Sequence, residues 1–303
     1  MDIDDIFTMM IYDNALKIKE AGQLDNFREL LEDNFMYNCF LFNEKKPLEY
    51  GVKNTVFDEA VSDDFDEGII RKALELGYYP MSMKKRITHI YELKEKDFAE
   101  ISSAGKKEDA EYFRNFMTIK YHSKKLIVPF EKLHVSKKLK GWLTGKFKDY
   151  TLTFNKAYDQ CIEKLLDSYK EEGTWLTEEL LEKYKAIHEN PDDKVSVDSV
   201  EIWHDGKLVA GEIGFTTHNA YASLSGFHTE DDVGTVQMCV LGLFLKNNSY
   251  AYWDLGMELD YKYRYGAEAC DRNRQEEFYA TLGKSKLSFP KEEIKLSDFL
   301  KYI

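Results

Sequence analysis

The sequence predicts an α+β protein whose C-terminal part contains an antiparallel β-meander, a helix and one further strand, in that order. Asp205-Gly206 separates two runs of alternating apolar and polar residues, and an Asp-Gly pair in that position is a strong signal for a tight hairpin. The apolar run after the meander exceeds the usual length of a strand and indicates a buried helix. The predicted elements are strands near 199–203, 207–215 and 220–225, a helix at 236–245 and a strand at 250–255.

The elements just before the meander follow from the same two periodicities. Residues 150–154 alternate like a strand, and 156–169 place apolar residues on one side of a helix. Thr177 can cap the next helix, whose first turn holds Glu178 and Glu179, and acids are favourable there because of the helix dipole.

The first eighty residues are acidic and are predicted to be largely helical. Apolar residues at helical spacing cover 25–31 and 68–76, and Gly77 ends the second of these helices. Between residues 84 and 119 we expect a short strand near 87–91, a charged helical stretch and a surface loop at 105–107.

The length of 303 residues predicts two domains, since a domain takes about 150 residues. We expect a smaller N-terminal domain at 1–125, with an insertion near 84–119, and a second domain at 126–303. The apolar fraction of 43% is ample for their cores.

Composition excludes several classes of protein. The N-terminus is acidic where a signal peptide would be basic, and no apolar run approaches the length of a membrane span, so we expect a cytoplasmic protein without membrane contact. The four cysteines form no CxxC pair, the seven histidines form no HExxH motif, and no glycine-rich phosphate loop is present. We therefore expect no metal and no cofactor.

The net charge of −13 is unevenly distributed. Residues 112–148 contain ten cations and only Glu131 as an anion, whereas the rest of the chain is strongly acidic. A solvated charge run is one interpretation. The other is an electrostatic footprint for a polyanion, because clustered lysines gain affinity by releasing condensed counterions.

The order of a β-meander, a helix and a strand resembles the core of the GNAT-like acyltransferase fold. Enzymes of that fold that use acetyl-coenzyme A need a glycine-rich pyrophosphate turn before the helix. Here residues 230–235 hold three acids and one glycine, and carboxylates would repel a pyrophosphate. A GNAT-like enzyme that uses another activated acyl donor remains an alternative.

Several motifs resemble those of the leucyl/phenylalanyl-tRNA–protein transferases. Glu172-Gly-Thr-Trp-Leu-Thr-Glu is followed by VDSVEIW and DGKLVAGEIG, and Leu133-His-Val-Ser-Lys-Lys-Leu and Gly77-Tyr-Tyr-Pro-Met81 match two segments upstream. The resemblance implies an enzyme that moves Leu or Phe from an aminoacyl-tRNA to a protein whose N-terminal residue is basic. Such an enzyme acts in an N-degron pathway of protein degradation, and we expect it to be a monomer.

The resemblance assigns substrate contacts to individual residues. It places Trp175 against the terminal adenosine of the tRNA, where an aromatic face can stack on an unpaired base, and Met81 where the family has a second tryptophan. The basic stretch would meet the acceptor arm, with Lys125 at the place of a family arginine. The predicted tRNA-binding residues are Lys124, Lys125, Lys137, Lys138 and Lys140.

The polar residues expected around the reaction differ from the family pattern. Asp254 matches a family aspartate and is the predicted catalytic residue, whereas Leu224 replaces a glutamate and Gly256 a glutamine. Ser225 and Phe227 follow Leu224 in the segment expected to contact substrate. The alternative is a diverged protein that binds tRNA or peptide without transferring an amino acid.

Glu212 falls where the family has an apolar residue of the aminoacyl pocket. A carboxylate in an apolar pocket is costly unless it is paired. Glu212 could therefore bind the ammonium of the peptide, replace the lost glutamate or select a polar aminoacyl group. It could also point outward from its strand into solvent.

Overall fold

The computed structural model describes residues 59–62, 65–86, 113–120, 122, 124–171 and 173–303, and they form an α+β structure as predicted. The chain divides into two compact units, one made of 1–121 with 177–180, the other of 122–176 with 181–303. The predicted helix at 25–31, strand at 87–91 and loop at 105–107 lie outside the described residues.

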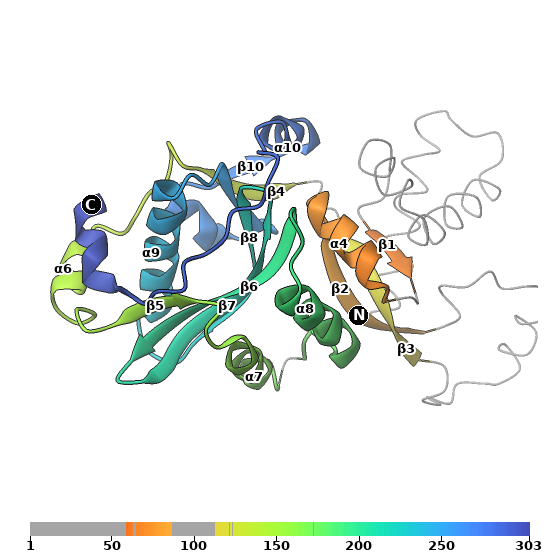
Figure 1. Ribbon diagram of the computed structural model, residues 1–303, viewed down its shortest axis with the longest axis horizontal. Helices are drawn as coiled ribbons and strands as arrows, with labels where there is room; N and C mark the ends of the chain where they lie inside the picture. The colour runs from red at the N-terminus through yellow and green to blue at the C-terminus, as the bar shows by residue number, and fades with distance from the viewer. Residues whose placement is uncertain (1–58, 63–64, 87–112, 121, 123, 172) are drawn as a thin grey trace, which may run out of the picture. The chain divides into compact units, whose positions relative to one another are not determined.

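The described part of the first unit contains a helix and a three-stranded antiparallel sheet of order β1-β3-β2 (Figure 1). The predicted helix is confirmed as α4, which begins after Asp66, whose carboxylate accepts a hydrogen bond from the Ile69 amide at 2.8 Å. The elements are β1 (Glu59–Ser62), α4 (Glu67–Glu75), β2 (Tyr79–Arg86) and β3 (Phe113–Lys120).

The charged helical stretch expected before residue 119 is wrong where the structure describes it. Residues 113–120 form β3, the middle strand of this sheet, and three of its residues, Met117, Thr118 and Ile119, are buried. Pairing on both sides overrides a weak local preference for helix. For the same reason the described residues of this unit are not mostly helical.

The second unit is built on an eight-stranded sheet of order β10-β4-β9-β8-β7-β6-β5-β11. Its elements are β4 (Lys125–Pro129), α6 (Leu139–Thr144), β5 (Thr151–Phe154), α7 (Tyr158–Ser168), α8 (Glu178–Glu189, whose first turn belongs to the first unit), β6 (Val195–His204), β7 (Lys207–Thr217), β8 (Ala220–His228), α9 (Val233–Asn247), β9 (Tyr252–Gly256), η3 (Asp260–Tyr265), β10 (Glu268–Cys270), α10 (Arg272–Tyr279), β11 (Ile294–Lys295) and η4 (Leu296–Tyr302).

The predicted meander, helix and strand are confirmed as β6, β7, β8, α9 and β9. Asp205 and Gly206 form the tight turn between β6 and β7, and both have positive φ, which is the backbone conformation that favours Asp-Gly there. The predicted strand at 150–154 is β5, and the two predicted helices that follow it are α7 and α8.

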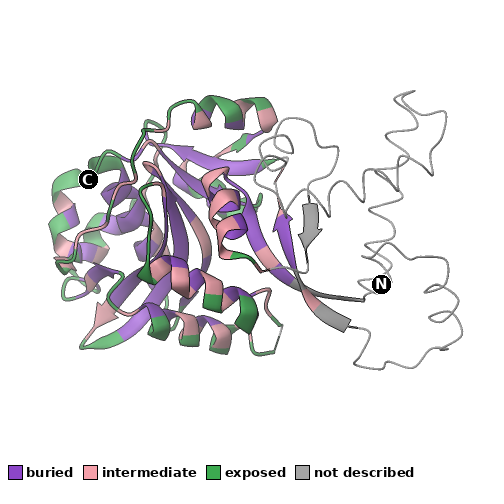
Figure 2. Cartoon of the chain, turned by 45° about the vertical axis from the view of Figure 1, so that its right-hand side comes forward, coloured by how far each residue is buried: buried purple, intermediate pink, exposed green. Residues whose placement is uncertain are grey.

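Helices cover both faces of this sheet. Gly211 on β7 lies against Cys161 of α7, whereas the next residue, Glu212, accepts a hydrogen bond from Gln237 of α9. Successive strand residues point to opposite faces, so α7 and α9 lie on opposite sides of β7, as Figure 1 also shows. Figure 2 shows the strands buried between exposed outer helix surfaces.

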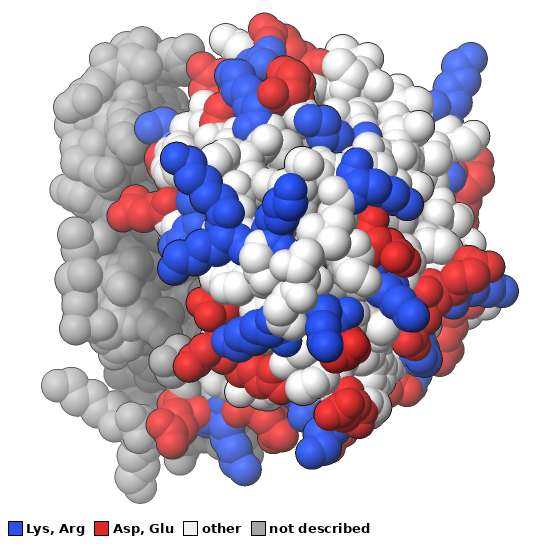
Figure 3. Space-filling view, turned by 90° about the vertical axis from the view of Figure 1, so that its left-hand side faces the viewer, with Lys and Arg blue, Asp and Glu red and all other residues white. Residues whose placement is uncertain are grey.

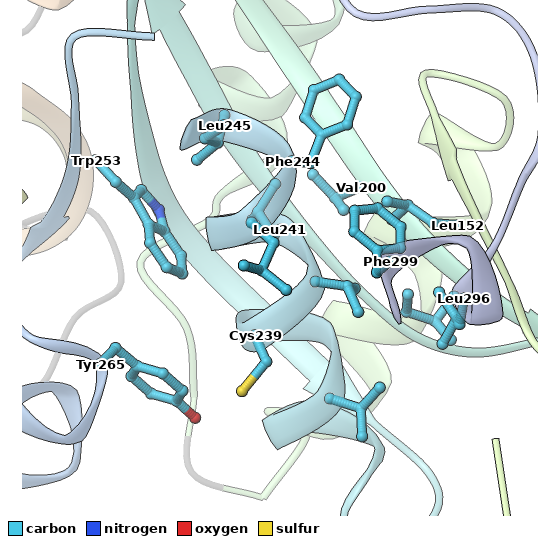
Figure 4. Close-up of a cluster of buried hydrophobic side chains, with 14 of the residues drawn as sticks. Leu152, Val200, Cys239, Leu241, Phe244, Leu245, Trp253, Tyr265, Leu296 and Phe299 are labelled. Atoms are coloured by element: carbon cyan, nitrogen blue, oxygen red, sulfur yellow. The ribbon is translucent and has the colours of Figure 1, made fainter. Parts of the chain in front are cut away.

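The main core lies on the α9 side (Figure 4). Leu241 and Leu245 of α9 are fully buried together with Trp253 of β9. Because α6 and η4 cover the side of α9 that faces away from the sheet, the helix is apolar around most of its circumference.

Gly266 fixes the segment that follows β9. Its φ is +85°, and a Cβ at this position would lie 1.9 Å from the carbonyl oxygen of Lys132. The amide of His134 donates to the carbonyl of Tyr265 at 3.1 Å, so η3 is held against the segment that follows β4. Only glycine combines this backbone conformation with such a close approach.

We expect Gly266→Ala to lower the free energy of unfolding by about 3 kcal/mol or more, because both the positive φ and the clash penalise a side chain. Urea unfolding followed by circular dichroism measures the change. Gly141→Ala is the matched control, since nothing lies within 4 Å of a Cβ at this helical position and alanine favours helix. Equal stabilities of the two variants would contradict the constraint.

Candidate active site

The parallel pairing of β8 with β9 is very short. It joins Tyr221 to Trp253 and Ala222 to Asp254, and beyond these pairs the two fully described strands no longer pair with each other. Immediately after this point the register of β8 against β7 shifts by one residue at Leu224, which forms a β-bulge. Bulges re-aim side chains and are frequent beside active sites. Of the predicted residues, Asp254 lies at this point, and Leu224, Ser225 and Phe227 follow it on β8.

Asp254 is the last residue of β9 that pairs with β8, and it is 4% exposed. Its Oδ2 accepts a hydrogen bond from Nζ of Lys125 at 3.0 Å, and its Oδ1 accepts one from the amide of Gly256 at 2.8 Å. Lys125 is the first residue of β4, the strand on the other side of β9. The predicted catalytic carboxylate is therefore held in one orientation by two strands.

The structure corrects the prediction for Lys125. Its side chain is completely buried, so it is no part of an exposed tRNA-binding surface. Its ammonium contacts Asp254 and also donates to the hydroxyl of Tyr279 on α10 at 2.9 Å. Burial alone would lower the pKa of Lys125, but Asp254 and Tyr279 outweigh it and the pKa is raised. The lysine thus stays charged as the partner of Asp254.

Glu212 does not point into solvent. It is 3% exposed on the α9 side of β7 and accepts hydrogen bonds from Tyr221, Ser223 and Gln237 at 2.9, 2.7 and 3.1 Å. Burial raises the pKa of the Glu212 carboxyl, although these hydrogen bonds and the charge of Lys262 oppose the shift. The three hydrogen bonds explain how a carboxyl group can occupy this interior position.

A hydrogen-bonded chain connects three strands of the sheet at this point. The indole Nε1 of Trp253 donates to the hydroxyl of Ser223 at 3.0 Å, and that hydroxyl donates to Glu212. The register places Asp254 on the opposite face of the sheet from Trp253. Glu212 and Asp254 are therefore close along the strands but lie on different faces.

The segment after the bulge faces α7. Ser225 is 9% exposed and its hydroxyl lies 3.2 Å from the hydroxyl of Tyr169, the residue that follows α7. Phe227 is buried beside Gly211 on the same face. Leu224 itself is partly exposed. The structure brings these three predicted residues together at the end of the parallel pairing.

Two predicted contacts of the terminal adenosine lie in different units. Trp175 is partly exposed in the segment between α7 and α8, in the second unit. Met81 is partly exposed on β2 of the first unit.

The other predicted tRNA-binding lysines are exposed. They are Lys124, which precedes β4, and Lys137, Lys138 and Lys140 around the start of α6. Figure 3 shows lysines and arginines gathered over the upper part of the face that carries α6, with acids below them and at the rim. Lys125 is thus the exception among five residues that look alike in sequence.

Sequence reasoning missed two residues of this region. Tyr279 belongs to no recognisable sequence motif, and Lys262 lies in a charged segment that is typical of an exposed surface. The structure instead buries Lys262 to 9% exposure, with its Nζ donating to the carbonyls of Leu255 and Met257. For Lys125, the sequence did offer a signal of burial, because this lysine directly precedes the apolar strand residues LIVP.

Among the described residues no group of three or more His, Cys, Asp or Glu side chains is arranged to hold a metal ion. No helix in the described ranges is long and apolar enough to span a membrane.

We expect Lys125→Met to lower the free energy of unfolding by about 3–5 kcal/mol, because it leaves the Asp254 carboxylate buried without its counter-charge. Combining it with Asp254→Leu should restore most of the loss, since no uncompensated charge then remains. Chemical denaturation measures both. The control is Lys132→Met, which breaks an exposed pair with Glu268 and should cost at most about 1 kcal/mol. A Lys125→Met protein as stable as the control would refute this role.

The sequence of this chain is similar to those of known proteins. A sequence model described as "Leucyl/phenylalanyl-tRNA protein transferase" matches residues 127–282. Proteins named leucyl/phenylalanyl-tRNA–protein transferase are similar over about half of this chain: one from Maridesulfovibrio salexigens is 31% identical over 49% of the chain and 60% of its own length. One from Pseudoalteromonas translucida is 29% identical over 50% of this chain and 61% of its own length. One from Flavobacterium johnsoniae is 28% identical over 52% of this chain and 71% of its own length.

The chain thus spans about three fifths of the length of the first two relatives. The matched region runs from β4 through α10, and so contains Lys125's partner Asp254, the bulge at Leu224 and the buried Glu212. Because the family model covers just over half of the chain, this protein belongs to the leucyl/phenylalanyl-tRNA protein transferase family.

Proposed function

We propose that this protein transfers an amino acid, of the Leu or Phe type, from an aminoacyl-tRNA to the N-terminal amine of a protein. Family membership supports this reaction. The observation that supports an assignment to particular residues is the ion pair of Asp254 and Lys125, which lies at the end of the β8–β9 pairing. A buried, charged carboxylate that two strands hold in place is suited to orient a polar reactant.

The proposed reaction is the aminolysis of an ester. The α-amine of the acceptor attacks the carbonyl carbon of the aminoacyl group, a C–N bond forms, and the tetrahedral intermediate collapses by breaking the C–O bond to the ribose of the terminal adenosine. The amine loses one proton and the leaving ribose oxygen gains one. Such a reaction needs proton transfer from the amine and stabilisation of the oxyanion.

We assign Asp254 to the acceptor amine, which it would orient and help to deprotonate. Leu224, Ser225 and Phe227 would contact the aminoacyl group, because they follow the point at which β8 leaves β9. Glu212 contributes a polar boundary on the α9 side. Trp175, which is partly exposed, would stack on the terminal adenosine.

The architecture of the second unit is consistent with a GNAT-like fold. The supporting features are the antiparallel meander β6-β7-β8, the crossover helix α9 and the parallel pairing of β8 with β9. We propose that the two domains divide near residue 122, where the two compact units divide, and not at 125/126, which would cut β4 after its first residue. We also propose a monomer that acts in the cytoplasm, where aminoacyl-tRNA is used, on acceptors with a basic first residue, as part of an N-degron pathway.

A second candidate function is tRNA or peptide binding without transfer. It is favoured by Leu224 and Gly256, which offer no polar side chain where two are expected. The retained Asp254–Lys125 pair favours the enzyme, because burying an ion pair is costly and an apolar pair would serve packing better.

Mass spectrometry after incubation with a panel of charged tRNAs and a peptide beginning with Arg tests the enzyme hypothesis. We expect a peptide product extended by one residue, and Asp254→Asn should lower its rate by about 10²–10⁴-fold. The control is Asp159→Asn, at an exposed ion pair on α7.

Two further variants separate the candidate functions. Leu224→Glu should raise the rate if the lost carboxylate limits it, and Glu212→Gln should abolish transfer if Glu212 has replaced that carboxylate. If the parent and Leu224→Glu are inert with every charged tRNA while tRNA still binds, the protein is a binding module.

We expect replacement of Lys124, Lys137, Lys138 and Lys140 by Ala to weaken tRNA binding and to reduce the slope of log K against log salt by about 3. Fluorescence anisotropy at several salt concentrations measures the slope. The matched control removes four exposed lysines elsewhere: Lys284, Lys291, Lys295 and Lys301. Equal slopes for the two quadruple variants would show that binding does not use this surface.

A further inference from the structure

Lys262 is a buried cation that the proposed reaction has not yet used. It is the third residue of η3, and its side chain runs inward to the end of β9 instead of outward to solvent. Its Nζ donates to the carbonyl of Leu255 at 2.5 Å and to that of Met257 at 2.9 Å. These carbonyls lie on either side of Gly256, so the ammonium is fixed next to the last residues of the strand that carries Asp254.

The ammonium is held by neutral groups but surrounded by negative ones. Asp254 and Glu212 both interact with it electrostatically, from β9 and β7 respectively. Within the described part of the chain, neither carboxylate comes close enough to form an ion pair with Nζ. Burial lowers the pKa of Lys262, and the two carboxylates oppose the shift. A cation that is mostly desolvated without a direct counter-ion is costly, which indicates a use for its charge.

Two of the three donors of the ammonium are used in these hydrogen bonds, and the third has the ring of Tyr261 beside it, with its centroid 5.9 Å from Nζ. An ammonium has three N–H groups, and two of those of Lys262 are directed at the carbonyls of Leu255 and Met257. These two bonds restrict the direction of the third N–H. A lysine that is anchored in this way can act as an oriented point charge, although a free lysine side chain is flexible.

The neighbouring Tyr261 indicates which region this donor adjoins. Its hydroxyl interacts electrostatically with Glu212 and with Tyr169, whose own hydroxyl lies beside Ser225. The position of Lys262 is given by its two hydrogen bonds, which fix it at the end of β9 next to Asp254. Asp254 pairs with Ala222 of β8, two residues before the bulge at Leu224. Two contacts hold η3 in this position: the close approach of Gly266 to the Lys132 carbonyl and the hydrogen bond from the His134 amide to the Tyr265 carbonyl.

We propose that Lys262 is a catalytic residue that donates a hydrogen bond to the carbonyl oxygen of the aminoacyl ester and stabilises the oxyanion formed when the acceptor amine attacks. This inference rests on the proposed function. Lys262 keeps its proton throughout: the amine proton passes to the leaving ribose oxygen, and Lys262 supplies only charge and direction. It takes the place of a polar side chain that Gly256 lacks. Removing one such donor typically costs about 10²–10³-fold in rate.

Single-turnover transfer from aminoacyl-tRNA to a peptide beginning with Arg tests the role. Lys262→Met should lower the rate by about 10²–10³-fold with little change in the KM for tRNA, and Lys262→Arg should restore part of it. Lys156→Met, which breaks an exposed pair with Glu293, is the control. Thermal unfolding of each variant identifies any that fail to fold.

The pH profile separates a catalytic from a structural role. The titratable groups that face Lys262 are Asp254 on β9, Glu212 on β7 and Tyr261 on η3, whose ring centroid lies 5.9 Å from Nζ. Because burial lowers the pKa of Lys262, the parent rate should fall at alkaline pH as this lysine loses its proton. In Lys262→Arg the guanidinium keeps its charge, so the fall should move to higher pH. If Lys262 only stabilised the end of β9, its replacement by Arg would change the stability of the protein, but the fall of the rate at alkaline pH would stay at the same pH.

Binding gives a readout that does not depend on turnover. An adenosine phosphonate carries a tetrahedral anion like that of the intermediate, whereas an aminoacyl-amide of adenosine resembles the ground state. Lys262→Met should weaken binding of the phosphonate by about 10²-fold and leave the amide unchanged. An active parent whose Lys262→Met variant retains full rate and phosphonate affinity overturns the role of Lys262 alone. A parent that is inert with every charged tRNA overturns the proposed function and this inference with it.

Discussion

The short parallel contact between β8 and β9 is the constraint on which the site depends. Parallel neighbours require a crossover connection, and α9 provides it while covering the core. The contact ends after two residue pairs, at Asp254, and β8 then changes register at Leu224. Polar groups from β4, β7, β9 and η3 converge where the two strands separate. If β8 and β9 paired along their whole length, the backbone of β8 would occupy the space beside the end of β9.

Buried charge distinguishes this part of the sheet from the apolar core that surrounds α9. Lys125 and Asp254 compensate each other directly, whereas Lys262 is held by backbone carbonyls and Glu212 by neutral donors. Each arrangement costs desolvation energy that well-packed apolar residues would not. The burial of two cations and two carboxylates on β4, β7, β9 and η3 is therefore costly for stability, and the proposed reaction gives these charges a use.

Local patterns predicted most of the second unit. The Asp205-Gly206 turn and the alternating runs around it determine the β6–β7 hairpin, and the length of the apolar run determines α9. These features depend on neighbours in sequence, where spacing of 2 or 3.6 residues is decisive. The same reasoning failed for 113–120, which forms the middle strand of a three-stranded sheet, because the partners on both sides come from distant parts of the chain. Motif resemblance located Asp254, Leu224 and Glu212 but not their surroundings.

The sequence by itself determined the α+β class, the order of the elements, the family and the position of the one retained aspartate. Only the tertiary structure decided which charges are exposed. Lys124 and Lys125 are adjacent and chemically identical, yet one faces solvent while the other, 129 residues before Asp254, is its buried partner. Glu212 and Lys262 are likewise interior in spite of their charge. Burial of a charge depends on whether a compensating group arrives from elsewhere in the chain, and such pairing over long sequence distances leaves no periodic signal to read.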